Sequence, residues 1–124
     1  MTDLFQFSAA QAAAAIRNGE CSSVELVQSC IERIQSLEDS VGAWAQFDPE
    51  HALQQARDAD QQRQSGAAIG PLHGVPVGIK DIFDTHDLPT EYGTALHAGH
   101  TPGHDATAVE QLRQAGAIIM GKTV

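Results

Sequence analysis

The sequence predicts an α/β fold, in which helices pack against a sheet whose strands are separated along the chain by a helix. Residues 75–80 are apolar at alternate positions, which is typical of a strand that enters a core. Residues 105–115 have the apolar spacing of a helix, and a continuous apolar run at 117–120 follows at once. A helix placed between two apolar strands indicates a layered α/β architecture.

Two helices are predicted at the start of the chain, each opened by a capping box. In such a box a serine caps the backbone of the residue three positions later, and the side chain of that residue caps the serine. Ser8 pairs in this way with Gln11, and Ser22 with Glu25. The second helix carries one apolar stripe and should end near residues 39–42. The stripe contains Leu26, Val27, Cys30, Ile31, Ile34 and Leu37.

The middle of the chain adds a short strand, a third helix and a long loop. A strand is expected over residues 43–47, and Asp48 with the proline after it should cap a helix that runs to about residue 64. Turn-forming residues dominate 84–104, so this stretch should be largely irregular. Asp105 is expected to cap the following helix and Gly116 to end it.

Composition and charge exclude several classes of protein. The formal net charge is −9 and no lysine precedes Lys80, which argues against binding to nucleic acid or to anionic lipid. No apolar run approaches the roughly 20 residues of a membrane span, and the N-terminus lacks the features of a signal peptide. The two cysteines, Cys21 and Cys30, fit a reduced, cytoplasmic protein, and Cys30 should be packed and unreactive.

Residues 70–81, with the sequence GPLHGVPVGIKD, resemble the segment that carries the catalytic lysine of the amidase signature family. The likeness continues through residues 88–94, 105–109 and 116–123, so it covers most of the chain from residue 70 onward. The order and spacing of these blocks make the resemblance specific. The three glycines of residues 70–81 are expected to allow tight turns and close backbone packing.

The resemblance implies that this sequence is the N-terminal portion of a single domain. Members of the family are several times longer, and their fold is a mixed sheet between layers of helices. Residues 1–124 would then supply the N-terminal helices and the first strands of an incomplete fold. A helical lead-in over residues 1–66 would precede a strand-loop-helix-strand unit over residues 67–124.

Lys80 matches the lysine that acts as the base in this family. There a serine attacks the amide, and its proton passes through a second serine, held in a cis peptide, to the lysine. A base must be uncharged, and burial at the end of an apolar strand disfavours a charged amine. Arginine could not take this role because it does not lose its proton. Both serines are expected beyond residue 124, so the chain alone should be inactive.

The resemblance also implies the substrate and partners. It favours an amidase that acts on the carboxamide C–N bond of a small molecule, without a metal or an organic cofactor, and that could form a homo-oligomer. The alternative within the family is the amidase component of a tRNA-dependent amidotransferase. Such a component releases ammonia from glutamine and works with partner subunits.

Two other patterns suggest sites that the surrounding sequence does not favour. Residues 116–123 fit the phosphate-loop pattern G-x-x-x-x-G-K-[ST] and include Lys122, but the residues between the glycines are apolar and a helix precedes them. A nucleotide binder is therefore the weaker alternative. His97, His100 and His104 lie in a Gly/Pro-rich loop, so solvated side chains are expected rather than a metal site. Asp81 is expected to steady the end of its strand.

Overall fold

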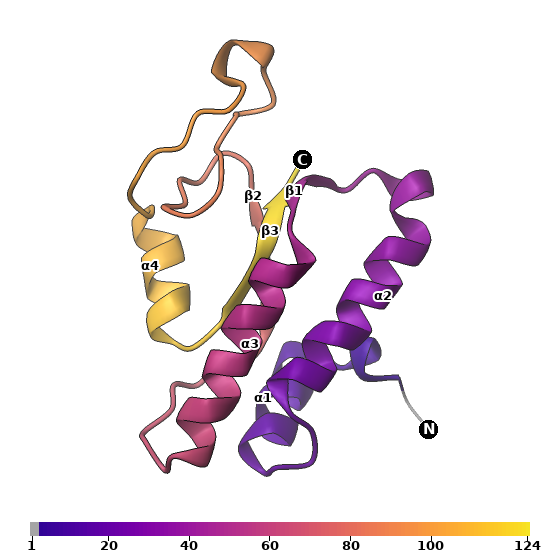
Figure 1. Cartoon of the computed structure of the whole chain (residues 1–124), viewed down its shortest axis with the longest axis vertical. Coiled ribbons are helices and arrows are strands. Elements are labelled where there is room, and N and C mark those ends of the chain that lie inside the picture. The colour runs from indigo at the N-terminus through magenta and orange to yellow at the C-terminus, as the bar shows by residue number, and fades with distance from the viewer. Residues whose placement is uncertain (1–2) are drawn as a thin grey trace.

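The computed structural model describes residues 3–124 and has the α/β fold that the sequence predicts (Figure 1). Two short 3-10 turns, Leu4–Gln6 and Ala95–His97, accompany the regular elements. The helices are α1 (Ala9–Arg17), α2 (Ser23–Val41), α3 (Pro49–Gln64) and α4 (Thr107–Gln114). The strands are β1 (Trp44–Phe47), β2 (Pro76–Lys80) and β3 (Ile118–Thr123).

The sheet has the strand order β1-β3-β2, so β3, the last element of the chain, occupies its centre. Strand β3 is antiparallel to β1 and parallel to β2. Parallel neighbours need a long crossover, and here the connection from β2 to β3 passes through α4. Lys80 pairs in register with Thr123, so the carboxyl ends of β2 and β3 meet at one edge of the sheet.

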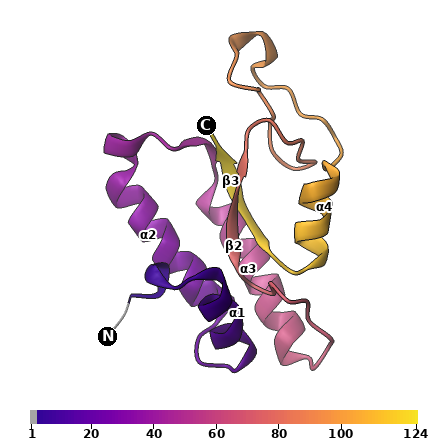
Figure 2. The same cartoon turned by 180° about the vertical axis from the view of Figure 1, so that it is seen from behind.

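Helix α3 covers one face of the sheet, since it lies in front of β3 in Figure 1 and behind it in the reversed view of Figure 2. Ile118 and Met120 point to this face and pack against α2 and α3. Ile119, between them, packs on the other side with Val109 of α4 and Ile79 of β2. The side chains of β3 thus alternate between two apolar clusters, as the pleat of a strand requires.

The helix starts confirm the predicted caps at the N-terminal half of the chain. Ser8 and Ser22 each form a capping box, and the Asp48 carboxylate accepts a hydrogen bond from the backbone of His51. The prediction for the fourth helix is wrong. Helix α4 begins after Ala106 without a side-chain cap, because the carboxylate of Asp105 binds other side chains.

A long loop joins β2 to α4 and extends beyond the carboxyl end of the sheet in both views (Figures 1 and 2). It is irregular, as predicted, apart from the turn at Ala95–His97. Among the helices of residues 3–124, none has the length and apolar character needed to cross a bilayer.

Candidate active site

Lys80 is the last residue of β2 and lies where the long loop leaves the sheet. The strand forms because Val75 and Ile79 are buried in the core, whereas Lys80 at its end is exposed. Close packing across the sheet requires Gly78, whose position touches the ring of Trp44. The alternation predicted from the sequence therefore delivers an amine to the carboxyl end of the sheet.

Lys80 lines a small hollow of about 130 Å³. The other residues around this hollow are Ala45, Asp81, Ile82, Tyr92, Gly93 and Val124. Most of them are apolar, yet Ile82 and Tyr92 are partly open to solvent. The described residues thus place Lys80 beside an apolar surface but leave it exposed, so they do not form the dry surroundings that were expected for an uncharged amine.

A buried ion pair lies directly beside Lys80. The Nζ atom of Lys122 lies 3.2 Å from Oδ1 of Asp81, and both side chains are almost completely buried. Lys122 Nζ also donates to Thr90 Oγ1 at 2.8 Å and to the carbonyl oxygen of Pro89 at 3.2 Å. All three ammonium protons therefore have an acceptor, as a fully buried lysine requires.

This position of Lys122 contradicts the nucleotide-binding alternative. Residues 118–123 form a central strand rather than a flexible loop, and the lysine that would bind phosphate is fully buried against a carboxylate. A phosphate loop needs backbone N–H groups that are free to bind the ligand. Here strand pairing with β1 and β2 takes that backbone.

Asp81 also orders the loop around the hollow, which confirms its predicted role at the strand end. Its carboxylate accepts the backbone N–H of Glu91 at 3.3 Å, and its carbonyl oxygen accepts that of Tyr92 at 3.1 Å. Tyr92 has a φ of 55°, a conformation that non-glycine residues rarely adopt, so these contacts hold it in place. A hydrogen bond from the Tyr92 hydroxyl to Asp84, at 2.9 Å, raises the pKa of the phenol.

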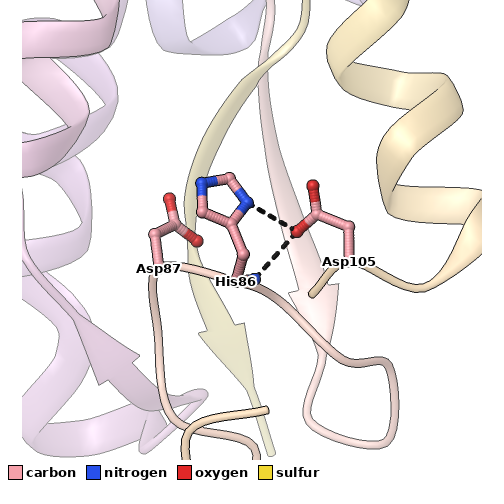
Figure 3. Close-up of side chains that lie close together, drawn as sticks. All are labelled: His86, Asp87 and Asp105. Atoms are coloured by element: carbon pink, nitrogen blue, oxygen red, sulfur yellow. Dashed lines mark hydrogen bonds and ion pairs between the residues drawn. The ribbon is translucent and has the colours of Figure 1, made fainter. Parts of the chain in front are cut away.

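A second polar cluster joins the loop to α3 and α4 and is centred on Arg113. Figure 3 shows its loop side, where His86 points to Asp105 and Asp87 lies next to it. Arg113 donates to Asp87 Oδ1 at 2.8 Å and to Asp105 Oδ2 at 2.9 Å. Nε2 of His51, on α3, lies 2.7 Å from the other oxygen of Asp87.

The two aspartates of this cluster titrate below their ordinary range. Burial alone would raise the pKa of Asp87, but the hydrogen bond with His51 and the charge of Arg113 outweigh it and lower the pKa. For Asp105 burial would likewise raise the pKa, but hydrogen bonds from His86 and the charge of Arg113 outweigh it. Both carboxylates are therefore held as anions by neighbouring donors.

The same contacts make this cluster a poor metal site. The ligand atoms of His86, Asp87 and Asp105 lie within 4.8 Å of one another, but each carboxylate oxygen already has a donor. A metal would have to displace the Arg113 guanidinium, which already neutralises the pair. We assign the cluster as a structural ion-pair network.

The loop histidines do not converge on a ligand set, which confirms their predicted exposure. His97 and His100 contact the ring of Tyr92, with ring centroids 5.1 and 6.4 Å from it. His104 lies 3.4 Å from a carboxylate oxygen of Asp84. All three are exposed. The stripe cysteine, Cys30, is half-buried on α2, and burial raises the pKa of its thiol, as its predicted packing role requires.

Comparison with known proteins gives consistent matches. The sequence profile of the Amidase family matches residues 25–124. The A-type subunit of the glutamyl-tRNA(Gln) amidotransferase of Salinispora tropica is 45% identical over 99% of this chain, which corresponds to 25% of that protein. Its counterpart in Chloroflexus aurantiacus is 40% identical over 98% of the chain and 25% of its own length. The chain thus spans about a quarter of the length of these curated relatives.

Solved structures share the fold. The peptide amidase of Stenotrophomonas maltophilia superposes with a TM-score of 0.87 at 34% identity, over 95% of this chain and 24% of that one. A fatty acid amide hydrolase gives a TM-score of 0.89 at 26% identity, over 97% of this chain and 21% of its own. Together with the family profile over residues 25–124, these matches show that the chain belongs to the amidase signature family.

Proposed function

We propose that this chain is the N-terminal portion of an enzyme that hydrolyses carboxamide C–N bonds, and that Lys80 is its base. The observation that carries the proposal is the place of Lys80, at the carboxyl end of β2 and beside an apolar hollow. Ligands of α/β sheets commonly bind outside this end of the strands. The lysine also lies in the matched part of the chain.

In this proposal Lys80 accepts a proton that a serine nucleophile loses as it attacks the amide carbon. The proton passes through a second serine, and both serines come from sequence that follows residue 124. That sequence would also cover the exposed amine of Lys80 and exclude water from the hollow, which favours the uncharged form. Residues 1–124 alone would then lack a nucleophile and would not hydrolyse amides. No step requires a metal or an organic cofactor.

A second candidate function is supported by the curated relatives. Those from Salinispora tropica and Chloroflexus aurantiacus belong to glutamyl-tRNA(Gln) amidotransferases and are 45% and 40% identical to this chain. In such an enzyme the substrate would be glutamine, and the ammonia would pass to partner subunits. The chemistry assigned to Lys80 is the same in both cases, so the two candidates differ in substrate and partners.

Release of ammonia by the complete protein tests the proposal. The substrates are a panel of simple carboxamides and glutamine, each with and without added amidotransferase partner subunits. Ammonia from a simple carboxamide without partners would identify an amidase, and ammonia from glutamine only with partners would identify an amidotransferase. Lys80→Ala should abolish either activity while the circular dichroism spectrum is unchanged. Arg57→Ala, which removes an exposed cation on α3, is the matched control and should retain it. Turnover by Lys80→Ala at the level of this control would refute the proposal.

A further inference from the structure

We propose that Lys122 is a positioning residue for Lys80: it binds the Asp81 carboxylate and so keeps that carboxylate from pairing with the neighbouring amine. The inference rests on the proposed role of Lys80 as a base. It concerns a buried charge that the amide chemistry itself does not use, and it assigns a purpose to the ion pair between Lys122 and Asp81.

Asp81 would otherwise be a natural partner for Lys80, because it follows Lys80 directly in the chain. A carboxylate that pairs with an amine favours its protonated form, which cannot act as a base. In the structure the Asp81 carboxylate instead pairs with Lys122. Within residues 3–124, Lys80 forms no ion pair. The pair therefore separates the carboxylate from the candidate base.

Stability alone does not explain a charge in this position. Lys122 is fully buried and the Asp81 side chain is 5% exposed, so both groups have lost nearly all of their hydration. Replacing a buried ion pair with packed apolar residues is often neutral or stabilising. A lysine of this kind needs another explanation, and its pairing with the residue that directly follows the candidate base supplies one.

Lys122 also ties together the three segments that surround the hollow. It belongs to β3, pairs with Asp81 at the end of β2, and donates to Pro89 and Thr90 of the long loop. The next residues of that loop lead to Tyr92, whose side chain lines the hollow with Lys80. Loss of the ammonium group would therefore release both the carboxylate and this wall.

The other carboxylates of the loop are already bound elsewhere. Glu91 accepts hydrogen bonds from the Gln46 side chain at 3.1 Å and from the backbone of Gly99 at 2.6 Å. Asp84 accepts the Tyr92 hydroxyl and lies near His104. The charge that Lys80 meets at this end of the sheet is thus governed chiefly by Asp81 and Lys122, which sum to zero when both are ionised.

This balance predicts opposite effects for the two charges. The measurement is the pH dependence of kcat/KM of the complete enzyme, whose acid limb reports loss of the proton from the base. Lys122→Met leaves the Asp81 carboxylate uncompensated and should move the acid limb to higher pH. Asp81→Asn leaves the Lys122 charge uncompensated and should move it to lower pH. Each shift should change the rate on that limb by about tenfold or more, the scale of one charge at close range.

The double variant Asp81→Asn with Lys122→Met removes both charges and should return the acid limb to its original pH. Arg57→Met removes an exposed cation from α3 and is the matched control, with no shift expected. Thermal unfolding of each variant shows whether it is folded. If Lys122→Met does not fold, Asp81→Asn decides by itself, since it preserves the shape of the side chain and its shift must be to lower pH.

The outcomes separate this inference from the proposed function. Loss of activity in Lys80→Ala together with unshifted acid limbs in the charge variants would overturn the inference and leave the base assignment intact. Shifts of the same sign in both single variants, as a purely structural role would produce, would also overturn it. Retained activity in Lys80→Ala would remove the foundation of both.

Discussion

Replacement of Arg113 by Met should destabilise the protein, and the loss should depend on pH. The substitution keeps an unbranched stem but removes the guanidinium that bridges Asp87 and Asp105, at 2.8 and 2.9 Å. The three side chains are only 22%, 13% and 12% exposed. Removing one partner of a buried pair costs about 3–5 kcal/mol, and a hydrogen bond to a charged group contributes about 1.5–3 kcal/mol. Because solvent reaches these groups in part, we expect a loss of about 2–4 kcal/mol at pH 7.

The sign of the pH dependence follows from the lowered pKa values of the two aspartates. Their folded-state pKa values lie below the ordinary value of 3.8, so their stabilising contribution is complete above 3.8 and is lost as the pH falls through the folded values. The difference in unfolding free energy between wild type and Arg113→Met should therefore be largest near neutral pH and shrink below pH 3.8.

Urea unfolding of the two proteins at neutral and acidic pH measures this difference. Arg57→Met is the control, because the pair between Arg57 and Glu50 is exposed at 43% and 76% and should contribute about 0–1 kcal/mol. An equal loss in both variants at pH 7 would refute the reasoning. So would a loss in Arg113→Met that does not change with pH, since the network would then act through packing alone.

Two predictions concern packing in the sheet. Gly121→Ala should destabilise the protein by about 1–3 kcal/mol or more, because a Cβ atom there would collide with the backbone oxygen of Gln46, whereas Gly78→Ala meets only side chains at 3.1 Å and should cost less; equal midpoints of urea unfolding would contradict this. Ile119→Ala, at a fully buried site of the central strand, should cost about 2–5 kcal/mol, and Leu96→Ala, at a site 91% exposed, should leave the unfolding midpoint unchanged; a comparable loss in both would show that the clusters are wrongly assigned.

Local signals in the sequence were sufficient to predict most of the regular elements. The caps at Ser8, Ser22 and Asp48 involve residues only three positions away, so each can be recognised in a short window. Asp105 fits the same pattern, but its carboxylate binds Arg113 and His86, which are 8 and 19 residues distant. Competition from a distant donor cannot be seen in a local pattern, and for that reason the predicted cap was wrong.

The site was predictable to a similar degree. A family motif and an alternating strand placed Lys80 at the end of β2, where the structure has it. The burial of Lys122 was missed because its pattern suggested a phosphate loop and strand β3 was expected to end before it. Asp81 and Lys122 lie at the carboxyl ends of neighbouring parallel strands, and only the pairing of those strands brings the charges together. That pairing was the missing signal.

Turnover of the Lys80→Arg variant of the complete enzyme tests the central claim most directly. Arginine keeps the positive charge and much of the length of lysine but cannot release its proton, so it separates a role in base catalysis from a role in charge or packing. We predict a fall in kcat of at least about 100-fold with an unchanged fold, the scale of a lost proton carrier. A variant with near-normal turnover of the amide would contradict the assignment of Lys80 as the base.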